Sequence, residues 1–318
     1  MGRNIINMQR SKQKNIIIAK LGLSSAILCI SLYFFSTIPV FAFENFQSEN
    51  KAISEILTAD IPLDEKVESD KVILDLSRIS QGYISVRYAG KNDKVKIQIS
   101  QGGNENNYNI LQDQYEKFIV LPLHAGNGKY EVKTIEYMQD GTYISVFETS
   151  FEVKMENELL PFLYPSAYVP FSPDSKAVLT AANIAQISVD DMDLIKNIFQ
   201  YISARMNYDE KRSKKLYETN EMYIPDIDEI LSKKSGVCLD CSTLMAAMLR
   251  SQKIPAQVVI GDFVSPDNTT QRHAWVRAFV RDSREDWVDI DPTYGIKLKL
   301  LPASFTNQYA VYRTDYFY

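Results

Sequence analysis

Apolar and polar residues alternate along the chain from Lys71 to about residue 153. The alternation is clearest in Ile84–Tyr88 and Val95–Ile99, where every second side chain is apolar. A period of two residues predicts strands that bury one face. The expected strands are Val72–Leu76, Tyr83–Tyr88, Lys94–Ile99, Lys117–Leu121, Tyr130–Tyr137 and Thr142–Val153.

Glycine-rich turn signals separate these strands. They lie at Gly90–Asp93, Gly102–Asn104, Gly126–Gly128 and Asp140–Gly141. Short strands joined by such turns are typical of two packed antiparallel sheets, so we expect an all-β sandwich-like domain over residues 69–156. No charged cluster in it suggests chemistry, and we expect His124, beside a turn, to be a surface residue.

Helical periodicity replaces the alternation in the second half, which we expect to form one domain over residues 157–318. Its first part, residues 156–187, contains four prolines and reads as a connector. A helix is expected over Asp190–Met206, with Ser188 and Asp191 as a capping box. The other expected elements are helices from Pro225–Asp226 to Leu231 and over Cys238–Ser251, and strands Gln257–Phe263, His273–Arg281 and Asp286–Asp291.

The N-terminal 42 residues have the pattern of a secretion signal. Their charges are all basic, and an uncharged apolar run from Leu21 to Phe43 follows. Pro39 breaks the run, and Val40-Phe41-Ala42 offers a cleavage site after Ala42. We therefore expect a signal peptide over residues 1–42, a polar lead-in over 43–68, and a secreted or cell-surface protein. An uncleaved membrane anchor is the alternative, since the run is long enough to span a bilayer.

Composition limits the classes of partner and scaffold. The chain has 35 Lys and Arg against 40 Asp and Glu, and five of the basic residues lie in the signal. An acidic body argues against nucleic acid as a partner, because phosphate binding needs a basic surface. Cys29 follows Leu28 within the apolar run and does not fit a lipoprotein site. Only Cys238 and Cys241 remain, too few for a disulfide-stapled scaffold.

Cys238 is placed where a cysteine becomes nucleophilic. It opens a predicted helix, whose dipole and free N–H groups favour a thiolate. A thiolate needs a base and the base needs an orienting group. His273 lies on a predicted strand, and Asp291 ends the next one. A hairpin of these two strands would set Asp291 beside His273.

Several spaced motifs together resemble the transglutaminase-like superfamily. The match covers about residues 190–295. The agreement of several spaced motifs at once is far more specific than a single motif. The matching segments are Asn207-Tyr208-Asp209, Gly236–Asp240, Leu249–Ala256, His273–Val276 and Asp291-Pro292-Thr293. The sequence departs from the family pattern at Lys253, where glycine is common, and at Cys241, where an aromatic residue is common. The preceding sandwich has no such resemblance.

The resemblance implies an α+β fold with a papain-like core and a catalytic triad of Cys238, His273 and Asp291. It implies acyl transfer from amide bonds of a protein or peptide substrate, by hydrolysis or by transfer to an amine. The cell wall is one expected location of such a substrate. It calls for no cofactor or metal, and for no membrane contact beyond an uncleaved N-terminus. The backbone N–H of Cys238 is the default oxyanion donor, with Tyr208 as a weaker candidate.

Other interpretations use the same atoms. Cys238, Cys241, His273 and Asp291 could form a tetrahedral zinc site, and Cys238-Leu239-Asp240-Cys241 could exchange disulfides. A non-catalytic binding module of the same fold is a third alternative. A zinc site gives no reason for the Asp-Pro-Thr and Ile-Pro-Ala segments, and redox folds place C-x-x-C after a strand. We expect Cys241 to face the core, Asp240 to satisfy helix N–H groups, and Trp275 and Trp287 to pack.

Overall fold

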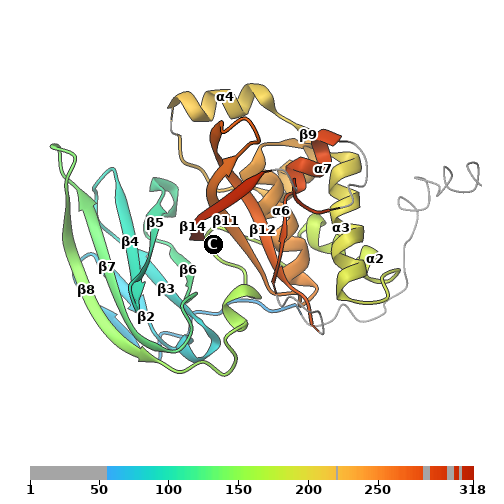
Figure 1. Ribbon diagram of the computed structural model, residues 1–318. Helices are drawn as coiled ribbons and strands as arrows, with labels where there is room; N and C mark the ends of the chain where they lie inside the picture. Colours follow the sequence, from blue (N-terminus) through green and yellow to red (C-terminus); the bar gives the residue numbers. More distant parts are fainter. Residues whose placement is uncertain (1–55, 220, 282–286, 299–303, 308–309) are drawn as a thin grey trace, which may run out of the picture. The chain divides into compact units, whose positions relative to one another are not determined.

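The computed structural model describes residues 56–219, 221–281, 287–298, 304–307 and 310–318 (Figure 1). All of them belong to one compact unit. The expected signal peptide and Cys29 lie outside the described residues. Within the described ranges, no helix combines the length and the apolar character needed to cross a membrane.

The first part of the described chain is a sandwich of two antiparallel sheets, with strand orders β1-β2-β3-β6 and β5-β4-β7-β8. Apolar side chains from both sheets, such as Leu74 and Ile97, meet in one buried cluster. This is the layering that alternation predicts. The strands are β1 Lys66–Glu68, β2 Val72–Asp75, β3 Tyr83–Tyr88, β4 Val95–Gln101, β5 Asn104–Ile110, β6 Phe118–Pro122, β7 Gly128–Tyr137 and β8 Tyr143–Val153.

Two of these strands were not expected. β5 begins with polar residues and buries only Tyr108 and Ile110, so its alternation is weak. The turn before it was expected. Gly102 and Gly103 have φ of 58° and 88°, and the type I′ turn of a two-residue hairpin requires such positive values. β1 lies inside the expected polar lead-in and pairs with β2 as a short, mostly exposed edge strand.

His124 is not the surface residue that the sequence suggested. Its ring stacks on Phe162, with centroids 5.4 Å apart, and its Nδ1 lies 3.1 Å from Asn106 Nδ2. Burial and the charge of Arg250 lower the pKa of His124 to about 3, so the ring is neutral. The turn residues around it hid this packing, because Phe162 comes from a distant segment.

The second part combines helices with an antiparallel sheet of strand order β13-β12-β11-β14. Its strands are β11 Ala256–Val264, β12 Thr270–Phe279, β13 Trp287–Ile290 and β14 Val311–Phe317. Its helices are α2 Lys176–Ala185, α3 Asp191–Arg205, α4 Glu210–Thr219, α5 Ile227–Lys233, α6 Cys238–Ser251 and α7 Pro292–Leu298. A β-rich region therefore precedes an α+β core, as expected.

Helix α6 is the centre of this core (Figure 1). It contacts β11 and β12 of the sheet and also packs against α2, α3 and α5. Every residue from Asp240 to Ser251 is buried. A helix that is buried all round is largely apolar, and the leucines, methionines and alanines of Leu244–Leu249 form the middle of this buried stretch. The packing of α6 against the sheet and the neighbouring helices thus fixes the position of Cys238.

A short parallel strand pair brings the end of α3 to the start of α6. In β9 (Asn207–Tyr208) and β10 (Ser235–Gly236), Tyr208 pairs with Gly236. Gly236 is needed there, because an added Cβ would lie 2.7 Å from Asp240 Cβ. The pair thereby sets Tyr208 beside the N-terminus of α6.

Buried Arg250 ties the C-terminal strand to the core. It donates from Nε to Ala256 O at 2.8 Å, from one terminal nitrogen to Tyr164 O at 2.9 Å and from the other to Tyr318 O at 3.0 Å. Burial lowers its pKa to about 9. Three carbonyl acceptors satisfy a charge that would otherwise be costly to bury.

Helix α3 begins differently from the expected capping box. Asp190 is the N-cap, and its side chain accepts from Asp193 N at 2.8 Å. Ser188 instead donates its hydroxyl to Ile184 O, at the end of α2. Helix α2 lies in the segment read as a connector, and α4, α7, β9, β10 and β14 were also not expected. Helix α4 buries no residue and so lacks a strong apolar period.

Candidate active site

Cys238 is the first residue of α6 and is partly exposed. Its backbone N–H is one of the first-turn donors that helix geometry leaves without an intrahelical acceptor. Asp240 Oδ2 accepts from Val237 N at 2.9 Å and from Arg212 at 2.7 Å, which fixes this turn. The expectation that Asp240 satisfies helix N–H groups is confirmed.

His273 lies on β12 opposite Gly261 of β11. Aromatic rings surround it: Phe263, Trp275 and Tyr312 have centroids 5.6, 6.4 and 6.2 Å from the imidazole. Only 14% of the His273 side chain is exposed. The ring is therefore held by packing, with one edge toward Cys238 and the other toward Asp291.

Asp291 stands between β13 and α7, and its carboxylate accepts hydrogen bonds on both oxygens. Oδ1 accepts from Thr293 N at 3.0 Å, Thr293 Oγ1 at 2.6 Å and Tyr294 N at 3.2 Å. Oδ2 lies 2.8 Å from His273 Nε2 and 2.9 Å from the hydroxyl of Tyr312. The Asp-Pro-Thr segment thus serves as the cap of α7 while it presents Oδ2 to His273.

The pKa shifts of Asp291, His273 and Cys238 favour the charged forms of all three groups. Burial opposes ionisation of Asp291, but the charge of His273 and hydrogen bonds from His273, Thr293 and Tyr312 hold its pKa below the usual value. Burial lowers the pKa of His273, and the stronger effects of Asp291 and Cys238 raise it to about 10. An ionised Asp291 accepts the Nε2 proton, so Nδ1 is the nitrogen that serves the sulfur.

The pKa of Cys238 moves in the opposite direction. Burial raises it, but the hydrogen bond and charge of His273, with the backbone N–H of Ala274, lower it below the usual value. A thiolate beside an imidazolium is the reactive form of such a cysteine. The arrangement can therefore present a sulfur nucleophile, from Cys238, and a proton donor, from His273, to the two atoms of one reacting bond.

A cavity of about 570 Å³ opens onto Cys238, His273 and Asp291. Helix α4 contributes Glu210, Ser213, Lys214 and Tyr217 to its lining. Thr269 before β12 and the first residues of β12, Thr270 to Arg272, line it as well. Tyr208, also in the lining, lies 3.1 Å through its hydroxyl from Ser213 Oγ, and the ammonium of Lys297 sits 4.6 Å from its ring centre. This cavity is large enough for an extended side chain and its flanking backbone.

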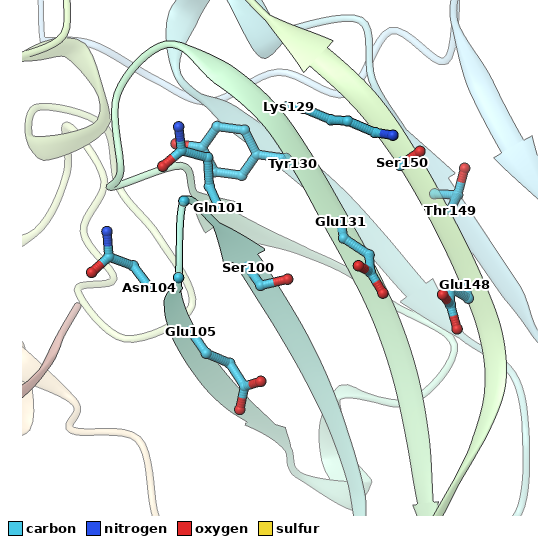
Figure 2. Close-up of a pocket in the computed structure, with 12 residues that line it drawn as sticks. Ser100, Gln101, Asn104, Glu105, Lys129, Tyr130, Glu131, Glu148, Thr149 and Ser150 are labelled. Carbon is cyan, nitrogen blue, oxygen red and sulfur yellow. The ribbon is translucent and has the colours of Figure 1, made fainter.

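A second hollow, of about 780 Å³, lies on the outer face of the sheet β5-β4-β7-β8 (Figure 2). Polar and charged side chains line it, among them Glu105, Glu131 and Glu148. Glu131 pairs with Lys133, and Glu105 accepts from Asn107 at 2.9 Å. Figure 2 shows no cysteine or histidine among its labelled residues, and we assign it no chemistry.

The remaining sequence candidates do not join the site. Cys241 is fully buried in the core with Leu244 and Met248, and burial raises its pKa. Asp289 accepts from Trp275 Nε1 at 3.2 Å and from Arg277 Nε at 2.9 Å. Among the described residues, no group of three or more His, Cys, Asp or Glu side chains could hold a metal ion.

One residue of the site was missed. Tyr312 lies on β14, outside every motif quoted above, in a segment whose sequence carries no chemical signature. The only available signal was the alternation of Tyr312, Thr314 and Tyr316 along a C-terminal strand.

Comparison with known proteins agrees with the motifs. Residues 180–292 match the family model of the transglutaminase-like superfamily. None of the curated proteins compared with the chain matches it.

Solved structures give weaker similarities. The crystal structure of a TGase is 22% identical, with a TM-score of 0.30 over 37% of this chain, and this chain covers 30% of it. The "putative cysteine protease" from Cytophaga hutchinsonii is 15% identical, with a TM-score of 0.36, covering 74% of this chain and 91% of that one. Red sea bream transglutaminase is 14% identical, with a TM-score of 0.26, covering 70% and 45%. Residues 180–292 carry the transglutaminase-like core that the motifs around Cys238, His273 and Asp291 predicted.

Proposed function

We propose that the protein is a cysteine acyl-transfer enzyme that acts on amide bonds of proteins or peptides. The observation that carries the proposal is the 2.8 Å contact between His273 Nε2 and Asp291 Oδ2, in a cavity that also exposes Cys238. The lowered pKa of Cys238 and the raised pKa of His273 support it.

In the proposed first half-reaction, the sulfur of Cys238 attacks the amide carbonyl carbon. The C–N bond breaks as His273 gives its Nδ1 proton to the departing nitrogen, and a thioester forms. Asp291 keeps its Nε2 contact and stabilises the imidazolium before that transfer. The backbone N–H of Cys238, which helix geometry leaves without an intrahelical acceptor, is the proposed donor to the developing oxyanion.

In the second half-reaction, water or a primary amine attacks the thioester carbon. His273 takes a proton from the attacking atom and keeps it as the C–S bond breaks. Cys238 leaves as thiolate, which restores the thiolate–imidazolium state. Water gives hydrolysis or deamidation, and a lysine amine gives a cross-link. Both outcomes share the first half-reaction, and the acceptor depends on how the cavity admits water and amines.

An acyl-trapping experiment tests the proposal. The full chain is mixed with a p-nitrophenyl ester as acyl donor, and the adduct is located by intact mass and peptide mapping. We expect one acyl group on Cys238, none in Cys238→Ala, and an unchanged adduct in Cys241→Ala. A fluorescent primary amine then measures the partition between transfer and hydrolysis. An adduct on Cys241, or neither an adduct nor the release of p-nitrophenolate, would contradict the proposal.

We further propose that the chain is exported by the signal of residues 1–42. The basic start, apolar run and Val40-Phe41-Ala42 site support this. N-terminal sequencing of the protein recovered from medium and cell surface is the test, and we expect a chain that begins at Phe43. Recovery only of an intracellular chain that begins at Met1 would contradict export, and a cell-surface chain with an intact N-terminus would indicate the anchor.

A further inference from the structure

Tyr312 reaches the carboxylate of Asp291 from β14, beyond the residues 180–292 that match the family model. Its hydroxyl donates to Asp291 Oδ2 at 2.9 Å, and the same oxygen lies 2.8 Å from His273 Nε2. We propose that Tyr312 is a positioning residue of the acyl-transfer site, which orients Oδ2 and moderates its interaction with the imidazolium. The inference rests on the proposed function, because it assigns Tyr312 a role in that reaction.

The direction of the Tyr312 hydroxyl is fixed. Asn307 N donates to the Tyr312 oxygen at 3.3 Å, so the O–H hydrogen is left for Asp291. Burial and the negative charge of Asp291 raise the pKa of Tyr312 well above its usual value. The hydroxyl therefore stays protonated, and remains a donor, throughout the pH range in which the triad works.

The ring of Tyr312 is packed as firmly as its hydroxyl is bonded. Its centroid lies 5.4 Å from that of Phe263 and 5.2 Å from that of Trp275, both in edge-to-face geometry. Trp275 is itself held by its bond to Asp289. Such aromatic pairs fix orientation as well as bury area. A hydroxyl on this ring consequently has little freedom to leave Asp291.

Strand pairing delivers Tyr312 to that place. β14 runs antiparallel to β11, with Tyr312 opposite Phe263, and a register shift follows at Ile260/Gly261. Gly261 allows this close approach, because an added Cβ would lie 1.9 Å from Arg313 O. At the far end Arg250 holds Tyr318 O. A glycine, a bulge and a buried arginine thus set the position of one phenol.

The two donors on Oδ2 share its negative charge. Without the Tyr312 hydroxyl, Oδ2 would interact with His273 alone, and the imidazolium would become a weaker acid. Proton donation to a departing amine would then slow. An ester that releases p-nitrophenolate needs no such proton, because its leaving group is already stable as an anion. The role therefore predicts an effect that depends on the leaving group.

Tyr312→Phe tests the role, because it keeps the ring and removes only the hydroxyl. For an amide substrate we expect kcat/KM to fall about tenfold, the scale of one hydrogen bond to a charged group. For a p-nitrophenyl ester we expect a much smaller loss. The basic limb of the pH profile should move to higher pH. Tyr316→Phe is the matched control on the same strand, partly exposed and opposite Ile260, and should behave as wild type.

Two results would overturn the inference. One is a Tyr312→Phe chain with wild-type rates and pH profile. The other is an equal loss on amide and ester with an unmoved basic limb, which would show a merely structural contribution. A wild-type chain that neither forms an acyl adduct nor releases p-nitrophenolate would instead refute the proposed function. The pH dependence of Cys238 alkylation by iodoacetamide then still compares wild type with Tyr312→Phe, and equal upper transitions would overturn the Tyr312 role by themselves.

Discussion

Asp291 is the residue on which most polar contacts of the site converge, and its substitution is the sharpest single test of the triad. Asp291→Asn keeps the size of the side chain and can retain the Oδ1 contacts with Thr293. An amide nitrogen at the Oδ2 position cannot accept from His273 or stabilise imidazolium. We expect the fold to persist, by circular dichroism, and the acylation rate to fall about a thousandfold or more.

Asp289→Asn is the matched control, because Asp289 lies two residues back, on β13, and is bonded to Trp275 and Arg277. Its acylation rate should stay within a few-fold of wild type. Native rates in Asp291→Asn with a large loss in Asp289→Asn would move the third triad position to Asp289.

The pH dependence of acylation should be bell-shaped. Because the pKa of Cys238 is lowered, the thiolate forms below the pH at which ordinary thiols ionise. Because the pKa of His273 is raised to about 10, imidazolium is lost only as the pH passes that value. The rate should rise through the first ionisation and fall through the second, and both apparent values belong to the coupled pair.

Acylation rates measured from pH 4 to 11 check this profile. His273→Gln should abolish acylation and return the alkylation profile of Cys238 to that of an ordinary thiol. A wild-type profile with one ionisation near pH 9 would show that Cys238 and His273 do not act as a pair.

At this scale the sequence predicted which elements position Cys238, His273 and Asp291, and it missed the contact from Tyr312. Cys238, His273 and Asp291 stand in motifs with fixed spacing on adjacent elements. Tyr312 depends on a strand that joins the sheet across a long stretch of chain, and on a bulge at Gly261. Neither leaves a local pattern in the sequence.

Among the elements, α4 has an unusual attachment. It buries no residue, and Arg212 joins it to the fully buried carboxylate of Asp240 at 2.7 Å. Burial raises the pKa of Asp240, and the Arg212 charge limits that rise. Arg212→Ala would leave the carboxylate without its counter-charge. We expect the free energy of unfolding to drop by about 2 kcal/mol at neutral pH, reduced from the fully buried case because Arg212 is half-exposed.

The sign of the pH dependence follows from the raised pKa. An acid whose folded pKa exceeds its unfolded pKa stabilises the fold at low pH, and this contribution is lost as the pH rises through the folded pKa. The destabilisation by Arg212→Ala should therefore grow between pH 4 and 7 in urea unfolding. Lys211→Ala, an exposed neighbour on α4, should show no such slope. A pH-independent loss would mean that Arg212 acts through packing on Tyr223, whose ring centre lies 4.5 Å from its guanidinium.

The elements that sequence could predict are those with a strong period. Strand β3 and helix α6 have the expected bounds. Apolar residues alternate along β3, and Ser235-Gly236 and Ile254-Pro255 delimit α6 in the sequence. Strand β5 and helix α4 were missed because few or none of their residues are buried. Helix α2 was missed because prolines precede it in the sequence. Ser188, which had suggested a cap for α3, donates its hydroxyl to Ile184 O at the end of α2 instead.

The whole described chain contains two separate apolar cores. One lies between the sandwich sheets, and the other surrounds α6 and contains no residue before Val169 among its buried members. Residues 157–318 should therefore fold when expressed alone and keep Cys238, His273 and Asp291 in place. We expect a soluble fragment whose melting temperature is several degrees below that of the full chain.

The reason for the lower stability is the loss of contacts with Tyr108 of the sandwich. Its ring centre lies 5.8 Å from that of Tyr168 and 5.5 Å from that of Tyr318, whereas the stack of Tyr168 on Tyr318 at 4.2 Å stays within the fragment. Calorimetry of the fragment and of the full chain makes the comparison. An insoluble fragment beside a soluble full chain would show that the sandwich completes the core, and the boundary at residue 157 would then be wrong.

The late position of β14 in the chain has a consequence for how activity can be lost. A chain that ends anywhere between residues 299 and 310 retains residues 180–292, which match the family model. It also retains Cys238, His273 and Asp291. It lacks the phenol that meets the carboxylate from the edge of the sheet. An early stop codon in this segment, or cleavage followed by loss of the C-terminal fragment, would thus yield a chain that still matches the family model but lacks the Tyr312 hydroxyl on Asp291. Surveys that rank such chains by their three motif residues alone would count these molecules as complete enzymes.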